Sequence, residues 1–286
     1  NKDFGFNVAF NMSAIKNKMT ELDGDVSYIG LPTSVIHSLN FDQEVSRSAI
    51  GQPIGSFYAY KEDGLFQSEA EIKSYTNNKG ELLQPNAKPG DIKFVDVNGD
   101  GVIDGNDRDY IGNPLPDVTA GLTLGVNFHN FDLSLFFQGM FGNDVYDLTR
   151  YVGDFYNQSQ YNKNSRVVNA WTPTNTNTDI PRVTMDDPNN NIRPSSYYVQ
   201  DASFVRLKNM KIGYSVPQSI LSKIKFNSLY IYAQATNLFT ITGYDGIDPE
   251  VGLQSYSSDY RNLDMGVDRG IYPLSRTFTF GVNVSF

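Results

Sequence analysis

The 286-residue sequence contains no cysteine and only two histidines, His37 and His129. The absence of cysteine excludes disulfide frameworks, thiolate metal sites and cysteine nucleophiles, and two distant histidines disfavour a catalytic zinc site. Basic residues are outnumbered, with 23 Lys and Arg against 32 Asp and Glu and a formal net charge of −9. This balance argues against nucleic-acid binding, which needs a basic surface to meet phosphates.

Long apolar runs are also missing. No stretch of about 18 apolar residues occurs, which excludes a transmembrane helix. A membrane-spanning strand leaves a weaker signal, an alternating segment of about ten residues. Aromatic residues are abundant, with 19 Phe, 18 Tyr and 1 Trp. Phe and Tyr at this level are typical of strands and of the aromatic girdles of membrane barrels.

Apolar and polar residues alternate with the two-residue period of a strand in about seven segments. The expected strands are 4–12, 47–61, 119–128, 131–140, 203–215, 229–239 and 275–286. His129-Asn130 is short enough for a tight hairpin turn. The capping box that starts at Ser68 predicts a short helix near 69–76. Within 203–215 the apolar residues change face, which a bulge near Lys208-Asn209 would explain.

Three long polar segments, 62–117, 142–200 and 240–274, connect the expected strands. Loops of this length are rare in a compact soluble domain. In a membrane barrel, by contrast, one side has short turns and the other has long loops. Counting strands back from the end of the chain puts all three segments on one side. The same count puts 15–44 on the opposite side, as an exception to the rule.

The last strand has one wholly apolar face, formed by Phe278, Phe280, Val282, Val284 and Phe286. Small or polar residues alternate with them. Barrels of the bacterial outer membrane end in this way, so we expect this face to meet lipid and to act as the C-terminal assembly signal. Since alternation begins at Phe4, we also expect the chain to be the C-terminal part of a longer protein.

Several motifs resemble the C-terminal half of SusC/RagA-like TonB-dependent transporters. They are GQPIGSFY (51–58), DGLF (63–66), KPGDIKF (88–94), DVNGDG (96–101), IGNP (111–114), NFDLSLFFQG (130–139), AWTP (170–173), FVRLKN (204–209) and YPLSRT (272–277). These matches run from about residue 50 to 286, and several are long, so the resemblance is specific.

This resemblance implies an all-β fold, an antiparallel transmembrane β-barrel of about 22 strands with a plugged lumen. The chain would supply a C-terminal segment of about seven strands, with 62–117, 142–200 and 240–274 as extracellular loops. The implied activity is TonB-dependent import of glycan or peptide nutrients across the bacterial outer membrane, with no enzymatic role. The implied partners are a SusD-like surface lipoprotein, outer-membrane lipid, the barrel-assembly machinery, and TonB-ExbB-ExbD acting through N-terminal parts that the chain lacks.

A twelve-residue acidic loop has the spacing of an EF-hand calcium loop. Its expected ligands are Asp96, Asn98, Asp100, the Val102 carbonyl, Asp104 and Asp107. Gly101 permits the sharp turn at position six, and Asp107 replaces the usual Glu at position twelve, as in the dockerin-type loops that this segment also resembles. We expect structural Ca²⁺ here. The alternative is an acidic, glycine-rich turn that binds nothing.

Three aromatic residues, Trp171, Tyr197 and Tyr198, are candidate substrate contacts, although large aromatics also anchor loop packing. The carboxylates at 186–187, 245, 248 and 250 have no visible acid/base partner in the sequence. No G-x-S-x-G motif, P-loop or dinucleotide fingerprint occurs. An alternative function stays open at this point, a calcium-stabilised, secreted β-rich binding module.

Overall fold

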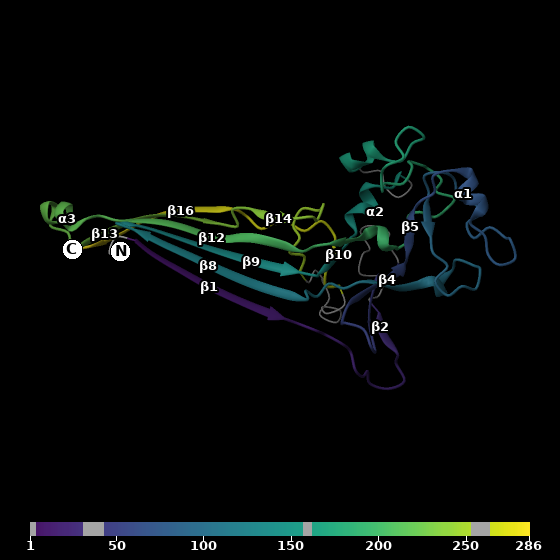
Figure 1. Ribbon diagram of the computed structural model, residues 1–286, viewed down its shortest axis with the longest axis horizontal. Helices are drawn as coiled ribbons and strands as arrows, with labels where there is room; N and C mark the ends of the chain where they lie inside the picture. Colours follow the sequence, from purple (N-terminus) through teal and green to yellow (C-terminus); the bar gives the residue numbers. More distant parts are fainter. Residues whose placement is uncertain (1–3, 31–42, 157–161, 253–263) are drawn as a thin grey trace.

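The computed structural model describes residues 4–30, 43–156, 162–252 and 264–286. Figure 1 shows a long sheet that extends to one side and a thicker region at its other end, where most of the connecting segments gather. We call the described connecting segments at that end the cap; they are residues 15–30 and 43–117, 142–156 and 162–203, and 243–252 and 264–276. None of the described helices is long and apolar enough to cross a membrane.

Six long strands lie side by side in the order β1-β8-β9-β12-β13-β16, and every neighbouring pair is antiparallel. They are β1 (Phe4–Ala14), β8 (Val118–Phe128), β9 (Phe131–Phe141), β12 (Phe204–Ser215), β13 (Ser228–Thr236) and β16 (Thr277–Ser285). The short β14 (Thr240–Thr242) pairs with the start of β12 and brings the sheet to seven strands. The segments 119–128, 131–140, 229–239 and 275–286 were each expected to be strands of one sheet, and this is confirmed.

The two faces of this sheet differ in chemistry, because successive side chains of a strand point to opposite faces. One row of the apolar face consists of Phe6, Val126, Leu133, Ile212, Ala233 and Phe280. The adjacent row on the other face consists of Asn7, Gly125, Ser134, Lys211, Gln234 and Thr279. The apolar face is uncovered, with Phe6 65% and Phe280 81% exposed. A continuous exposed apolar surface of this kind marks contact with a membrane or a partner.

Two local predictions about these strands are confirmed. His129 and Asn130 connect β8 to β9, and Phe128 pairs directly with Phe131 across the turn. His129 adopts a positive φ of 52°, as tight hairpin turns require. In β12 the pairing with β9 shifts between Leu207 and Asn209, so the expected bulge is present, and it keeps Leu207 and Met210 on the same apolar face of the sheet.

The expected position of the N-terminal connections is wrong. The segment 47–61 does not join the main sheet, because its strands β3 (Ser46–Ala49) and β4 (Ser56–Tyr60) form a separate sheet with β2 (Tyr28–Gly30) and β7 (Arg108–Gly112). β1 therefore pairs directly with β8. Since these two strands are antiparallel, the residues that connect them lie at the cap end with the other long loops. Residues 31–42 lie outside the described part of the chain.

The remaining elements are short. In the cap, β5 (Glu62–Leu65) pairs with β6 (Ile92–Phe94), and β10 (Asp144–Asp147) lies between β11 (Val199–Asp201) and β15 (Val267–Asp268). The cap helices are α1 (Glu69–Ser74) and α2 (Thr149–Gly153), and 3-10 turns occur at Gly105–Asp107, Ser165–Asn169 and Ser196–Tyr198. Ser68 caps α1 by accepting a hydrogen bond from the Glu71 N–H, so the predicted helix is confirmed. α3 (Gln218–Ile224) lies at the opposite tip of the molecule.

The main hydrophobic core belongs to the cap. Its buried members are Val45, Phe57, Leu65, Ile92, Phe94, Tyr146, Leu148, Tyr151, Phe155, Trp171, Ile192, Tyr197, Tyr198 and Val267. They come from all three parts of the cap, so the long loops pack against one another around a shared core and do not fold separately.

Candidate functional site

An open cleft of about 710 Å³ lies in the cap. Polar side chains form most of its wall. The lining residues are Glu62, Asp63, Gly64, Leu65, Gln67, Ile92, Arg150, Thr176, Asn177, Thr178, Asp179, Ser196, Tyr197 and Val199. Carboxylate, amide, hydroxyl and guanidinium groups therefore face one space, an arrangement suited to hydrogen bonding with a polar ligand.

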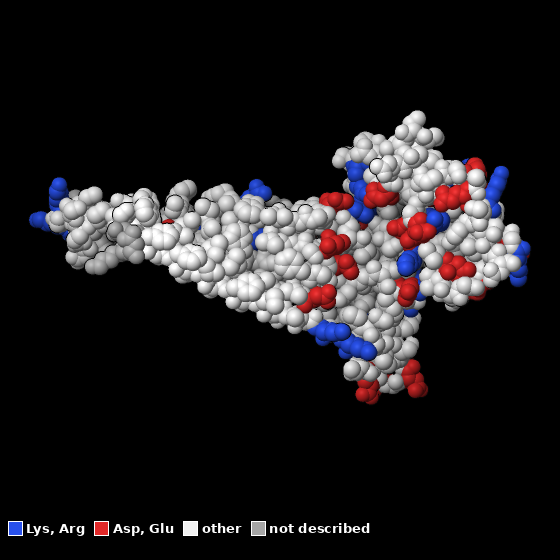
Figure 2. Space-filling view, viewed as in Figure 1, with Lys and Arg blue, Asp and Glu red and all other residues white. Residues whose placement is uncertain are grey.

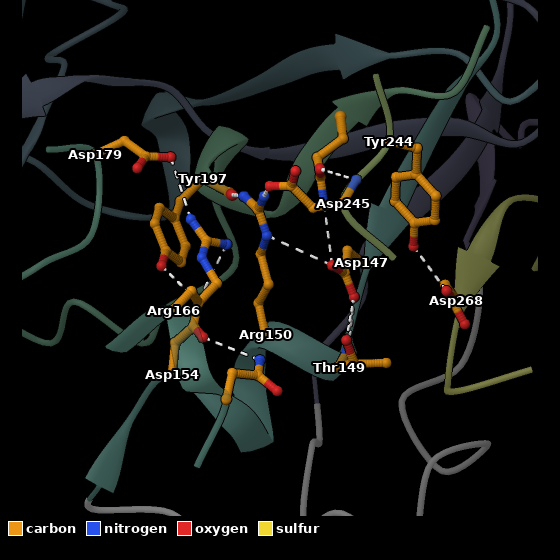
Figure 3. A network of polar contacts seen from close by, with 12 residues as sticks. Asp147, Thr149, Arg150, Asp154, Arg166, Asp179, Tyr197, Tyr244, Asp245 and Asp268 are labelled. Carbon is orange, nitrogen blue, oxygen red and sulfur yellow. Dashed lines mark hydrogen bonds and ion pairs between the residues drawn. The ribbon is translucent and has the colours of Figure 1, made fainter. Parts of the chain in front are cut away.

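Arg150, on α2, connects three segments at this cleft and is 6% exposed. Its guanidinium donates to the Tyr197 carbonyl at 2.8 Å and to the Asp245 carboxylate at 3.0 Å. The Nε atom forms an ion pair with Asp147 at 3.4 Å. In Figure 3 these partners surround the guanidinium from different strands and loops. Arg150 thereby fixes the position of Tyr197 relative to the loop that contains Asp245.

Tyr197 is held by a second set of charges. Its hydroxyl donates to the Asp154 carboxylate at 2.6 Å. Arg166 forms ion pairs with Asp154 at 3.5 Å and with Asp179 at 3.2 Å (Figure 3). Burial, with a smaller contribution from Asp154, raises the pKa of Tyr197 well above its usual range. Tyr197 therefore keeps its proton and acts as a fixed hydrogen-bond donor.

The rim of the cleft is acidic, with Glu62, Asp63 and Asp179 in its lining. Asp63 is paired with Lys93 at 2.7 Å and Asp179 with Arg166, so two of the three carboxylates have cationic partners. Glu62 instead accepts a hydrogen bond from the Gly64 N–H. Burial raises the pKa of Glu62, and the neighbouring charges of Asp63 and Asp179 act in the same direction.

The three aromatic candidates differ in position. Tyr197 lines the cleft, whereas Tyr198 is fully buried and donates its hydroxyl proton to the Ile192 carbonyl at 2.9 Å. Trp171 is 8% exposed and donates from Nε1 to the Gln67 side chain at 2.9 Å. Its ring packs so closely on Gly90 that a Cβ there would lie 2.4 Å from a ring atom. These contacts favour packing roles for Trp171 and Tyr198, and substrate contact remains a prediction.

The acidic loop is closed by hydrogen bonds from its own backbone. The pairs are Gly99 N to Asp96 at 2.8 Å, Gly101 N to Asp96 at 2.9 Å, Asp100 N to Asn98 at 2.8 Å, Val102 N to Asp100 at 3.0 Å and Asn106 N to Asp104 at 2.7 Å. Such side-chain turns are typical of Asx residues in tight loops. The expected ligands therefore lie along one compact turn.

Asp107 closes this loop from its far end. Its carboxylate is fully buried and accepts hydrogen bonds from the backbone of Val97 at 2.9 Å and Asp104 at 2.7 Å. In the described part of the chain, no three His, Asp or Glu side chains converge closely enough to hold a metal ion. The donor types suit Ca²⁺, but binding would require further convergence of the side chains, and it remains a prediction.

The sequence did not reveal the partners of the carboxylates at 245, 248 and 250. Arg206, which is 2% exposed, donates to Asp248 and Glu250, and Lys208 donates to Glu250 at 2.7 Å. Hydrogen bonds from Arg206 and the backbone hold the pKa of Asp248 below its ordinary value, although burial alone would raise it. Arg206 and Lys208 lie in the FVRLKN segment, so the cations were visible but their partners were not.

The apolar face of β16 is exposed along its whole length. The exposed fractions are 62% for Phe278, 81% for Phe280, 59% for Val282, 42% for Val284 and 82% for Phe286. Register with β13 places Val282 opposite Ile231 and Asn283 opposite Tyr230, so the predicted alternation of the two faces is present. Whether this face directs assembly remains a prediction.

The whole chain is similar to TonB-dependent receptors. It is 38% identical over 287 residues to TonB-dependent receptor P3 of Formosa agariphila. The aligned region covers 100% of this chain and 27% of that protein. TonB-dependent receptor SusC of Bacteroides thetaiotaomicron is 27% identical over 290 residues, again with 100% of this chain and 25% of the relative covered. The chain thus spans about a quarter of these curated relatives. No family model matches it.

The fold also has close counterparts among solved structures. A chain in the structure of the RagAB peptide transporter superposes with a TM-score of 0.72 at 23% identity, covering 100% of this chain and 27% of the other. The 'closed-closed' state of the RagAB peptide importer gives 0.69 at 24% identity. At this level of identity the likeness concerns the fold.

Proposed function

We propose that the chain is the C-terminal part of a SusC/RagA-like TonB-dependent receptor, as its full-length similarity to such receptors supports, and that this parent protein imports a nutrient across the bacterial outer membrane. The described strands form part of the barrel wall, and the cap lies on the extracellular side. Since the chain spans about a quarter of its curated relatives, transport is an activity of the whole parent protein. The chain contributes barrel wall and ligand-facing loops rather than catalysis.

The observation that carries this proposal is the two-faced sheet. Its apolar face is continuous across six strands and remains exposed, while the opposite face holds Asn7, Lys211 and Gln234. A transmembrane barrel needs an apolar exterior and a polar lumen. A secreted binding module would have to cover such a face to stay soluble. The geometry therefore supports the transporter over the secreted module.

The cleft of the cap is the proposed ligand contact. The proposed partners are a SusD-like lipoprotein over the cap and TonB-ExbB-ExbD as the energy source. The support is that the relatives are TonB-dependent and that the structural counterpart is a RagAB complex. Glycans and peptides both present the hydroxyl and amide groups that the exposed lining residues Thr176 and Asn177 can bind. The proposed substrate class is therefore a polar oligomer, glycan or peptide.

Uptake by cells that carry the parent protein tests the proposal. Labelled glycan and peptide pools are supplied to cells with the parent, without it, or with the energy supply through TonB removed. We expect one pool to enter only when both the parent and TonB are present. The variant Asn177→Ala should weaken uptake of that pool, whereas Lys79→Ala, an exposed cap residue outside the cleft, should not. Uptake that is unchanged without the parent would reject the proposal.

We also propose that the loop from Asp96 to Asp107 binds structural Ca²⁺. The support is the EF-hand spacing and the single compact turn along which its oxygen donors lie. Calorimetry with the parent protein and millimolar Ca²⁺ should give heat that Asp100→Ala removes. Asp109→Ala, an acidic neighbour outside the loop, is the matched control. Equal traces for wild type and Asp100→Ala would leave the loop as a turn that binds nothing.

A further inference from the structure

Aromatic side chains gather at the end of the sheet that lies away from the cap. Pairing places Phe4, Phe128, Phe131 and Tyr214 side by side in one row of the apolar face. The Phe131 and Tyr214 rings are 4.6 Å apart. Beyond the row, Phe226 and Phe286 form an edge-to-face pair at 5.1 Å. Such rows form the girdles that lie at the surface of a bilayer.

α3 lies directly beyond this row, next to the N- and C-terminal ends of the described chain (Figure 1). The chain enters α3 from β12, whose last residue, Ser215, donates from its N–H to the Asn130 carbonyl of the hairpin turn at 2.8 Å. Leu221 is buried, whereas Ile220 is 50% exposed. The helix therefore presents an exposed apolar side chain at this end of the sheet.

The charged side chains of the α3 segment are basic. Lys223 and Lys225 are exposed, and neither forms an ion pair with any residue that the structure describes. The segment from Val216 to Tyr232 contains no Asp or Glu. Asp132, at the start of β9, lies on the polar face of the sheet, where it accepts a hydrogen bond from Tyr230 at 2.9 Å. Figure 2 shows blue and no red at the α3 tip.

We propose that α3 and the adjoining aromatic row bind the anionic headgroups of phospholipids at the bilayer surface. The inference rests on the proposed function, because it needs the sheet to lie in a membrane. Two unpaired lysines complement anionic headgroups, and the continuous apolar face of the sheet places them at the right depth. Each lysine near such a surface should favour an anionic over a neutral lipid by roughly fivefold, so the pair should give roughly 25-fold at low salt.

Site-specific fluorescence quenching tests this proposal in the full-length parent. The chain has no cysteine, so Ser222→Cys on α3 provides a single labelling site here, and any cysteine elsewhere in the parent is replaced by serine. The labelled protein is reconstituted with brominated phosphatidylglycerol or brominated phosphatidylcholine. We expect phosphatidylglycerol to quench at much lower mole fractions. The preference should shrink when ionic strength rises, because salt screens exposed charges.

The double variant Lys223→Gln/Lys225→Gln should reduce the preference to near one. Lys79→Gln/Lys88→Gln, which neutralises two exposed lysines of the cap, should leave it unchanged. Heat-modifiable gel mobility verifies that each variant is folded. Equal quenching by the two lipids, quenching by neither, or a preference that survives in the double variant would each overturn the proposal.

Uptake measured on the same variants separates this proposal from the proposed function. Normal uptake without lipid preference rejects only the headgroup site. A clear lipid preference without uptake rejects import and leaves the headgroup site intact.

Discussion

Phe6 and Phe280 in the sheet are 65% and 81% exposed, whereas Phe57 and Phe94 in the cap are fully buried. Phenylalanine therefore has two different environments in one chain, a buried core in the cap and an exposed face on the sheet. The cap excludes water with its own core, as a soluble domain does. The apolar side of the sheet has no such cover and is exposed, and in the proposed transporter it would meet lipid. Figure 2 agrees, since charged residues gather over the cap and most of the sheet is free of them.

The polar groups differ between the two regions in the same way. In the cap, Arg150 and Arg206 are buried in ion pairs that connect distant segments. In the sheet, Lys211 lies over the rings of Tyr230 and Tyr232 on the polar face, with its Nζ 5.0 and 4.7 Å from the ring centroids. A buried ion pair loses stability when either partner is removed, because the remaining charge is left buried and unpaired. A side chain on the polar face needs only to be polar enough to contact water in the lumen of the proposed barrel. We therefore expect a single substitution to destabilise either the cap or the sheet while leaving the other region folded.

Arg206→Ala should have the largest effect, and it should act on the cap. Removing one member of a buried pair costs about 3–5 kcal/mol, because Asp248 would remain buried without its cation. We expect rapid proteolysis of the 243–252 segment in the parent protein, with unchanged heat-modifiable mobility of the barrel. Lys208→Ala is the control. The Lys208 side chain is 19% exposed, so its ion pair with Glu250 should contribute only about 0–1 kcal/mol. Equal proteolysis of the two variants would contradict the anchoring role of Arg206.

Val282→Arg should act on the sheet and leave the cap core intact. An arginine on the lipid face costs about 2–4 kcal/mol at mid-bilayer. We expect a much lower yield of heat-modifiable, folded barrel than with Asn283→Arg, whose side chain points to the polar face. Equal yields for the two variants would falsify the assignment of the faces.

Deleting Phe286 should have a smaller effect, mainly on the rate of assembly. The deletion removes the ring contact with Phe226, and such pairs contribute about 0.5–1.5 kcal/mol. Pulse-chase labelling of the heat-modifiable form should show slower assembly, and Phe286→Tyr, which keeps a ring, should assemble nearly normally. A deletion that assembles at the wild-type rate would remove the assembly role of this residue.

The smallest effect concerns the pH dependence of the cap. Burial raises the pKa of Glu62, so the folded state binds its proton more tightly than the unfolded state. The stability that protonation of Glu62 provides is present at low pH and is lost as pH rises from about 4.3 through the folded pKa. Glu62→Gln should flatten this part of the cap's pH–stability profile, measured by resistance to proteolysis. Identical profiles for wild type and variant would remove Glu62 as its source.

Much of the sheet could be predicted because its signals are local. The two-residue alternation of apolar and polar side chains predicted its main strands. The short His129-Asn130 connection predicted the hairpin, and the change of face in 203–215 predicted the bulge at Lys208. The position of 15–44 was predicted wrongly because 47–61 also alternates. Alternation identifies a strand but not the sheet that the strand joins, and β3 and β4 joined the sheet of the cap.

The candidate site was only partly predictable. Tyr197 was recognised because aromatic residues often contact ligands. Arg150 was missed because nothing near it in the sequence indicates that its partner Asp245 lies 95 residues away. Trp171 was visible, but only its contacts with Gly90 and Gln67 indicate that it anchors packing.

The sequence alone therefore determined the chemistry of each strand face and the short turn between β8 and β9, since both depend on residues that are close along the chain. The tertiary structure decided which long segments form the cap, which arginine pairs with which carboxylate, and which aromatic side chains are buried. These outcomes depend on packing between distant segments, and side-chain periodicity carries no information about which of those segments meet.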